Sequence, residues 1–376
     1  MNDISRAFAD VSIVQVEAYL VSKSWFMNGG LSSVGTLWHR KDNESAEVVL
    51  PKHPGIREFR KHFNGALTTL SEFEGRSVAE VVADVVRMSS NLITVRVIGA
   101  DTANGTIPIN DGVLLFSKAK DLLYAAALSM YSKRKQFSGQ LPKDAKAYVD
   151  SLLLGQTEIG SYVVNVIAPL PPPRPAQETG AGPEVPVAEA VTLNLVHGLE
   201  AIAKATTEFA DSRSFKVFDA AVERGVSANM CDALIGFSGF ERNRDFEVRV
   251  SGAAGPMFEG ETKVFKFDAD AIVAVQKASD YYKGDYTLDH RNIWGFVKKL
   301  DRPKGQDVGT ITVEAAVDGV ERSIKIMLNP DEYHQAVLAH DTKVIVACSG
   351  NIHIKNRRAT LLNPTGFRII ALNKLL

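Results

Sequence analysis

Two short polar groups have the residue types and spacing that catalytic chemistry needs. The first is Glu261-Thr262-Lys263, which has the E-x-K spacing of metal-dependent nuclease sites and lies at the start of an expected strand. Such a site needs a further carboxylate on a neighbouring strand, and Asp245 or Glu247 is the upstream candidate. A three-residue pattern also arises often by chance, so an exposed strand end explains the same residues.

The second group is Gln156, Thr157, Glu158 and Ser161, between an expected helix and an apolar strand. Glycines flank this turn, and polar side chains in such a place suit a binding loop. A helix end at Gly155 with a buried polar contact explains the group equally well. We therefore take Gln156, Glu158 and Ser161 as a candidate polar site without an assigned reaction.

Other cofactor, metal and nucleophile motifs are absent from the sequence. It has no G-x-x-x-x-G-K-[ST] phosphate loop, no G-x-G-x-x-G after a strand and no H-E-x-x-H. His334 and His340 lie six residues apart, which places them on different faces of a helix. The only cysteines, Cys231 and Cys348, form neither a C-x-x-C motif nor a disulfide framework. We expect no cofactor and no metal, and we favour a binding protein over an enzyme.

Charge is unevenly distributed in the second half of the chain. Residues 190–289 carry 11 Lys and Arg against 16 Asp and Glu, whereas residues 290–376 carry 13 against 8. A basic domain with aromatic side chains can stack bases and contact phosphates. We predict nucleic-acid binding by Trp294, Phe296, Lys298, Lys299, Arg357 and Arg358, extended by Arg302, Lys304, Tyr333, Lys355, Phe367 and Arg368. The alternative is that the acidic stretch docks on the basic one.

Strand patterns crowd together in this basic stretch. Five strands are expected, at 293–300, 310–317, 322–328, 343–349 and 359–370. Between the third and fourth lies a helix with an Asn329 cap and Pro330 in its first position. This is the element order of an OB-fold barrel, and a generic five-stranded barrel or sandwich is the alternative.

The first 169 residues mix helices and strands, which indicates an α+β domain. A hairpin is expected over 35–50, and Asn104-Gly105 predicts a second hairpin that joins 91–98 to 106–109. The stretch 112–131 is apolar nearly all round, which predicts a central buried helix. Continuous β-branched residues at 161–168 predict an interior strand.

The opening helix and hairpin carry Trp38-His39-Arg40 and then Val48–His53. Over residues 15–70 this segment resembles the small HicA-type toxin ribonucleases, which have a double-stranded-RNA-binding-like fold. The resemblance implies that His39 acts on RNA, although the glycine before that histidine is missing here and the following helices differ in length. The alternative is that His39 is a surface strand residue.

Seven prolines in about twenty residues mark a boundary in the middle of the chain. We predict an α+β domain at 1–169, a Pro-rich linker at 170–189, a mixed helical and β segment at 190–289, and an OB-like β-barrel at 290–376.

Bulk composition limits the remaining function classes. The chain is 45% hydrophobic and 23% charged with a formal net charge of −1, so no whole-protein attraction to nucleic acid or membrane is expected. The N-terminus has no signal-peptide pattern, and we expect a cytoplasmic, bacterial-type protein without a membrane partner. The leading hypothesis is a non-enzymatic protein that binds single-stranded nucleic acid or a protein partner. The alternatives are a metal-dependent nuclease-like hydrolase and a scaffold subunit of a bacterial multi-protein system for antiviral defence.

Overall fold

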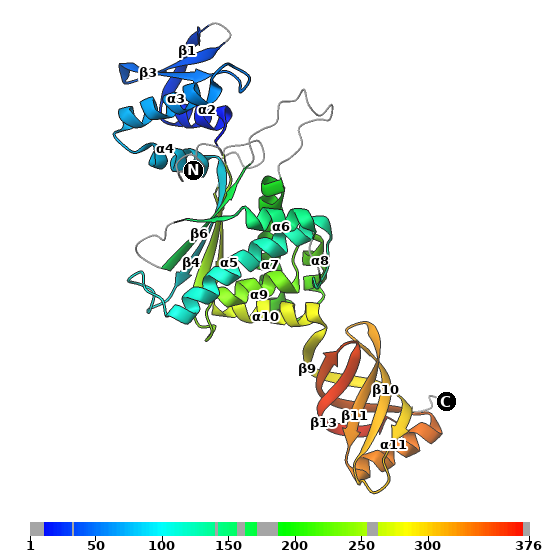
Figure 1. Cartoon of the computed structure of the whole chain (residues 1–376). Helices are drawn as coiled ribbons and strands as arrows, with labels where there is room; N and C mark the ends of the chain where they lie inside the picture. The colour runs from blue at the N-terminus through cyan, green and yellow to red at the C-terminus, as the bar shows by residue number, and fades with distance from the viewer. Residues whose placement is uncertain are drawn as a thin grey trace. The chain divides into compact units, whose positions relative to one another are not determined.

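The computed structural model describes residues 11–31, 34–139, 142–155, 162–170, 187–253 and 262–370 (Figure 1). The described residues form ten helices and three sheets, which confirms the mixed α+β class. The chain divides into two compact units, Met1–Val275 and Gln276–Leu376. Within the described ranges, every helix is too short or too polar to cross a membrane.

The first unit opens with a small three-stranded sheet, helices and a shared core. In chain order the elements are α2 (Ile13–Ser22), β1 (Trp25–Leu31), β2 (Gly35–Arg40), β3 (Asn43–Pro51), α3 (Phe59–Glu74) and α4 (Val78–Met88). The sheet is antiparallel in the order β1-β2-β3. The sequence pattern misses β1 because Asn28-Gly29-Gly30 is typical of a break. The strand includes these residues through an irregular register between Met27 and Gly30.

A five-stranded antiparallel sheet forms the rest of the first unit. Its order is β5 (Leu153–Leu154), β6 (Tyr162–Pro169), β4 (Ser90–Ile98), β7 (Asp245–Ser251) and β8 (Thr262–Phe267). The remaining helices are α5 (Ile109–Tyr131), α6 (Lys143–Asp150), α7 (Val187–Ser212), α8 (Val217–Glu223), α9 (Ala228–Phe237) and α10 (Ala269–Lys283). Helices α5 and α7 pack on one face of this sheet (Figure 1). The β6 strand is interior, as its apolar sequence predicts.

One expectation for the first unit is wrong, and a second holds only in part. The segment from 99 to 108 forms turns and no second hairpin strand, and the Gly105 N–H donates to the Thr102 carbonyl oxygen at 3.0 Å. The Asn-Gly dipeptide therefore serves an isolated turn that precedes a helix. That helix is buried mainly in its second half, because Ile109 and Val113 in its first turns are 81% and 66% exposed.

The five-stranded sheet joins segments on both sides of the Pro-rich stretch. Strands β4 and β6 precede residue 170, whereas β7 and β8 follow residue 190, and β4 pairs with β7 over seven residues from Leu92 to Ile98. The compact units consequently divide between Val275 and Gln276, away from the predicted linker. Residues 171–186 of that linker lie outside the described residues.

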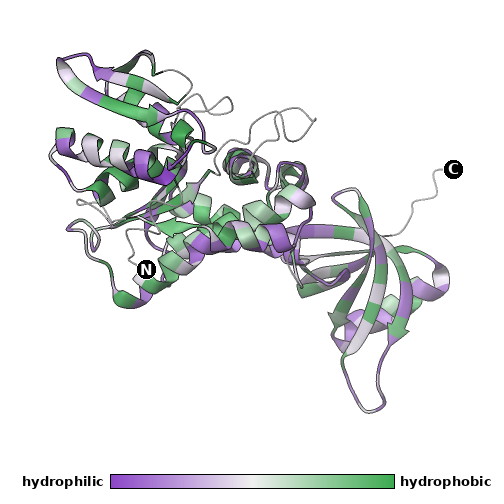
Figure 2. Ribbon diagram, turned by 45° about the horizontal axis from the view of Figure 1, so that its top comes forward, coloured by the Kyte–Doolittle hydropathy of each residue, from purple (hydrophilic) through white to green (hydrophobic). Residues whose placement is uncertain are grey.

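The second unit is a closed ring of five strands with one helix. Its elements are β9 (Asp285–Asp301), β10 (Gly309–Val317), β11 (Val320–Leu328), α11 (Pro330–Thr342), β12 (Ile345–Lys355) and β13 (Arg358–Ile370). The strands follow the order β10-β11-β13-β12-β9, and β9 pairs again with β10. Only the β11–β13 pair is parallel among these strands. Hydrophobic and hydrophilic residues alternate along them, as Figure 2 shows, so one face fills the ring and the other meets solvent.

The predicted helix start and the predicted order of elements along the chain hold in the ring, but one strand is much longer than expected. The Asn329 side chain accepts the Glu332 N–H at 2.9 Å, which confirms the cap. Strand β9 begins at Asp285 and not near Ile293, because its first half carries charged and polar residues that hide the alternation. This first half pairs with β12, while the second half pairs with β10.

Candidate nucleic-acid interface

Two aromatic side chains stand on the outer face of β9. Trp294 and Phe296 are 56% and 50% exposed, whereas Ile293 and Val297 on the inner face are buried. Gly295 lies between the two aromatic residues and pairs with Ala315 on one side and Val346 on the other. The two rings therefore occupy successive outward positions of a strand that is paired at both edges, and they offer flat apolar surface to solvent.

The two predicted lysines follow on the same strand at an irregularity. The register shifts between Thr312 and Val313, which pair with Lys299 and Val297, so Lys298 is the extra residue of a bulge. Both lysines are exposed. The Lys298 ammonium forms an ion pair with Glu314 of β10, so its charge is partly compensated.

Strand register extends this outward surface around the ring. Lys299 pairs with Thr312, Thr312 with Lys325, Lys325 with Thr360, and Thr360 with His353. The neighbours of Lys325 and His353 along their strands are buried isoleucines, so these side chains face outward. At about 4.8 Å between strands, this outward row is roughly 19 Å long. It connects Lys299 with cations that lie far away in sequence.

The predicted Arg357 and Arg358 lie at the far end of the row, in the turn from β12 to β13. Asn356 and Arg357 occupy its two central positions with φ of 48° and 66°. A two-residue hairpin turn with positive φ at both positions favours Asn-Gly, so Arg357 occupies a place where glycine is preferred. Both arginines are exposed.

A basic hollow opens where the row meets this turn. It has a volume of about 620 Å³, and its lining residues are all polar or charged: Lys325, His353, Lys355, Asn356, Arg358 and Thr360. An acidic side chain lies at its border, because Asp285 contacts the His353 Nε2 at 2.7 Å and the Lys355 Nζ at 2.9 Å. Hydrogen bonds from Lys355 and then His353 hold the pKa of Asp285 below its usual range.

The structure thus assembles part of the predicted set and rejects two members of it. The outward row leads from Lys299 to Thr360, two residues after Arg358 on β13, and Trp294 and Phe296 are exposed nearby on β9. Tyr333 and Phe367 are only 9% and 7% exposed, so they belong to the packing of the ring and cannot act as stacking surfaces. The Arg302 guanidinium lies over the Tyr333 ring, with its carbon 5.6 Å from the ring centroid.

Sequence reasoning missed four residues of the hollow: Lys325, His353, Asn356 and Thr360. A signal for two of them exists, because Ile324-Lys325-Ile326 and Ile352-His353-Ile354 place one polar residue between buried ones. The signal shows that they face outward. It does not show that they converge, since their convergence depends on the parallel pairing of β11 with β13.

The candidate nuclease group is not assembled among the described residues. Glu261 lies outside the described residues, and Lys263 stands exposed on the edge strand β8. Glu247 is 5% exposed and contacts Arg249 at 2.5 Å and Arg96 at 3.6 Å. Its carboxylate is thus used in a cross-strand ion pair. Across the described ranges, no cluster of three His, Cys, Asp or Glu side chains could hold a metal ion.

The other predicted sites take part in no described catalytic arrangement. Gln156, Glu158 and Ser161 lie outside the described residues. The His39 Nε2 lies 3.6 Å from the Glu47 carboxylate, and its ring contacts Phe26 with centroids 6.2 Å apart. The side chain of His39 is only 12% exposed, and its implied action on RNA stays a prediction.

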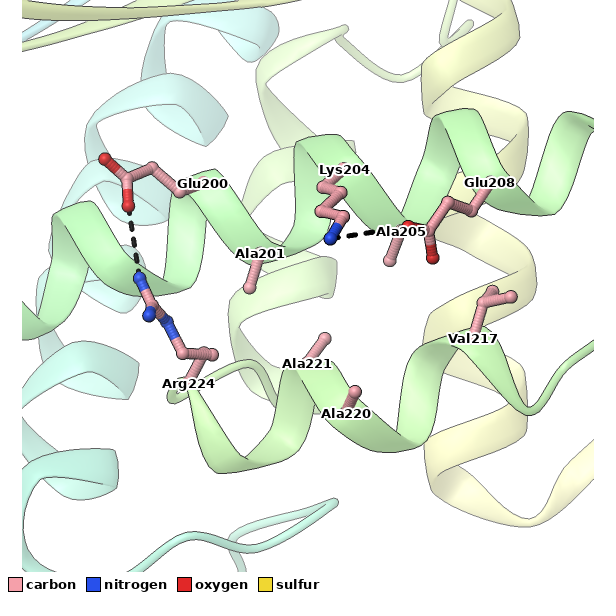
Figure 3. Close-up of a pocket in the computed structure, with 9 residues that line it drawn as sticks. All are labelled: Glu200, Ala201, Lys204, Ala205, Glu208, Val217, Ala220, Ala221 and Arg224. Atoms are coloured by element: carbon pink, nitrogen blue, oxygen red, sulfur yellow. Dashed lines mark hydrogen bonds and ion pairs between the residues drawn. The ribbon is translucent and has the colours of Figure 1, made fainter.

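A second hollow, in the first unit, lies between α7 and α8 and has a volume of about 340 Å³ (Figure 3). Its charged groups are paired with one another, Arg224 with Glu200 at 3.2 Å and Lys204 with Glu208 at 3.6 Å. Alanine side chains make up much of the remaining wall. It offers no nucleophile, and the basic hollow of the ring is the stronger candidate for binding.

Comparison with known proteins adds no assignment to this geometry. No protein-family model, no curated protein and no solved structure matches the chain. The functional argument consequently rests on the residues and contacts of the chain itself.

Proposed function

We propose that the second unit is an OB-type barrel and that it binds single-stranded nucleic acid without catalysing a reaction. Three features support the fold assignment: the strand order around the ring, the parallel contact between β11 and β13, and the placement of α11 between β11 and β12. The OB-fold uses the face of its second and third strands, here β10 and β11, to bind oligonucleotides.

The outward row is the observation that carries this proposal. It crosses β10 and β11 and leads from Lys299 to the basic hollow, with Trp294 and Phe296 exposed on the strand that begins it. Lysines spaced along such a path contact successive phosphates, and exposed rings stack on bases of any sequence. The row is long enough for about four nucleotides, at the lower end of the range for one OB-fold.

Each group has a distinct part in this proposal. The aromatic pair supplies base stacking, which is worth about 1–3 kcal/mol per base when removed by alanine substitution. Lys299 and Lys325 supply backbone charge, while Lys298 contributes less because Glu314 already compensates it. Nothing in the row reads base edges, so weak sequence preference is expected. The cytoplasmic location, the bacterial source and a role in antiviral defence stay predictions of the sequence.

Fluorescence anisotropy with labelled 15-nucleotide dT and rU strands and the full chain tests this proposal. We expect binding that weakens steeply between 50 and 300 mM salt. Trp294→Ala and Phe296→Ala should each lower affinity about tenfold or more, as loss of one stacked base implies. Phe240→Ala is the matched control, because Phe240 is 65% exposed in the other unit and should not affect binding.

The lysines are tested by the salt dependence itself. Lys299→Ala and Lys325→Ala should each reduce the slope of log K against log salt by about 0.7, the value for one phosphate contact on a single strand. Lys204→Ala, at an exposed site of the first unit, should leave the slope unchanged. Absence of binding by the full chain at 50 mM salt would exclude the proposed function.

A further inference from the structure

The basic hollow carries more positive charge than a phosphodiester backbone requires. Lys355 and His353 share the Asp285 carboxylate, but Lys325 and Arg358 have no acidic partner among the described residues. These two cations stand on neighbouring strands, since Lys325 of β11 pairs with Thr360, two residues after Arg358 on β13. Two uncompensated positive charges therefore face one hollow.

The neutral part of the lining also suits a phosphate group. The Thr360 hydroxyl and the Asn356 amide can donate hydrogen bonds between the cations, and all the described lining residues are polar or charged. A hollow of about 620 Å³ is large enough for a complete nucleotide, not only for the phosphate.

The turn that closes the hollow is built at a conformational cost. Arg357 adopts a φ of 66° in a position that favours glycine, and it is an exposed cation between Asn356 and Arg358, which both line the hollow. Residues that depart from local conformational preference are concentrated at functional sites. Glycine at this position would relieve the backbone but would remove the charge.

Charge matching then distinguishes the two kinds of phosphate that nucleic acid offers. A phosphodiester carries one negative charge, whereas a phosphate monoester carries about 1.5 to 2 at pH 7. Two uncompensated cations with neutral donors between them match the monoester. The last three residues of the outward row, Lys325, Thr360 and His353, line the hollow, so a strand that follows the row from Lys299 reaches the hollow with its end.

We propose that the basic hollow binds the terminal phosphate monoester of a single strand, so that the ring recognises phosphorylated ends. This inference rests on the proposed function, because the strand reaches the hollow along the row. Lys325 and Arg358 contact the phosphate oxygens, and Thr360 and Asn356 orient them. Asp285 keeps His353 and Lys355 in place at the border.

The test compares one oligonucleotide sequence with three kinds of ends: 5′-phosphate, 3′-phosphate and hydroxyl at both ends. Full-length protein should bind one phosphorylated form about tenfold more tightly than the hydroxyl form, as expected for charge-assisted hydrogen bonds. The preferred form identifies which end occupies the hollow. Inorganic phosphate at millimolar concentration should remove the preference and leave binding of the hydroxyl form.

Single substitutions test whether the hollow is the source of the preference for a phosphorylated end. Lys325→Ala and Arg358→Ala should remove most of the tenfold preference, and Lys325→Arg should retain it. Lys304→Ala removes an equal charge from the exposed segment between β9 and β10, so it should change the affinity for all three oligonucleotides by the same factor. Arg357→Gly should weaken the preference while the melting temperature stays equal or rises.

The two proposals fail in different ways. Equal affinity for all three ends in the unaltered protein would overturn the terminal-phosphate site and leave the single-strand function intact. A preference that persists in both Lys325→Ala and Arg358→Ala would also overturn it, because the phosphate would then bind elsewhere. Absence of binding for all three oligonucleotides would exclude the proposed function and this inference with it.

Discussion

Gly295 is the residue of the ring at which a single added methyl group should do the most damage. A Cβ at this position would lie 1.9 Å from the Glu314 carbonyl oxygen and 2.9 Å from a Val313 methyl group. Real Cβ contacts are essentially never below 3.0 Å, so the β10 backbone would have to move by roughly 1 Å. Since β9 pairs with β10 and β12 at this residue, the strand cannot move without breaking pairs on one side.

The expected loss of stability has two parts, the overpacking at Gly295 and the hydrogen bonds that break between strands. Overpacking a well-packed site costs about 1–3 kcal/mol, and each lost ladder hydrogen bond adds about 1 kcal/mol. With one lost hydrogen bond, Gly295→Ala should therefore lower the free energy of unfolding of the ring by about 2–4 kcal/mol. It should also weaken single-strand binding, because Trp294 and Phe296 flank the displaced residue.

Hydrogen exchange measured by mass spectrometry reads this effect within each unit separately. Peptides from β9 and β10 should lose protection in Gly295→Ala, whereas peptides from β4 in the first unit should not change. Gly65→Ala is the control, because Gly65 is in the exposed face of α3 and its added methyl group would contact nothing. That change should stabilise the first unit by about 0.5–1 kcal/mol. Unchanged protection of β9 in Gly295→Ala would refute the reasoning.

Two further predictions concern the first unit. Arg244 contacts Asp101 at 2.6 Å and Asp111 at 2.9 Å, so Arg244→Ala should cost about 3 kcal/mol at pH 7 in urea unfolding. The hydrogen bond from Arg244 lowers the pKa of Asp101. Burial alone would raise the pKa of Asp111, but hydrogen bonds from the Phe240 N–H and from Arg244 have the larger effect, so that pKa is lowered as well. Carboxyl groups with a lowered pKa stabilise the fold above about pH 4, and this stabilisation is lost as the pH falls through their pKa values. The difference in unfolding free energy between Arg244→Ala and the unaltered protein should therefore shrink below about pH 4. A difference that stays constant with pH would contradict this. The second prediction concerns a chain expressed as two polypeptides, residues 1–175 and residues 183–376. They should co-purify, because β4 of the first pairs with β7 of the second. Independent elution of two folded halves would show that the sheet does not join them.

Local sequence signals predicted much of the fold because they depend on nearby residues. Ser77 and Glu80 have the spacing of a capping box, which predicts the start of the helix over 78–88, and their reciprocal hydrogen bonds are present. The ring strands β10 and β11 are indicated by strict alternation. The Asn104-Gly105 turn misled for the same local reason, since the dipeptide specifies a turn and cannot specify whether a strand or a helix comes after it.

The predicted boundary at 289/290 lies near the division between the compact units, but the predicted boundary at the prolines does not. Prolines between 169 and 186 indicate a tether, but the pairing of β4 with β7 connects residues about 150 positions apart. Apolar alternation in β7 shows that it is a strand and does not name its partner. Composition divides the chain at the prolines and again at 289/290, whereas the packing contacts divide it near the middle of α10.

The same limit explains why only half of the candidate surface was predicted. Lys299 and Lys325 lie 26 positions apart in sequence and meet on one row only through β10, where a bulge at Lys298 sets which lysine pairs with Thr312. Residue type alone made both Trp294 and Tyr333 candidates for stacking, and packing separates them, because Trp294 is 56% exposed and Tyr333 only 9%. Burying Trp294 would have gained stability, as it does for Tyr333. The exposed rings of Trp294 and Phe296 and the charges of Lys299 and Lys325, which are unpaired among the described residues, contribute little to the stability of the fold. A nucleic-acid strand supplies bases that stack on such rings and phosphates that pair with such charges.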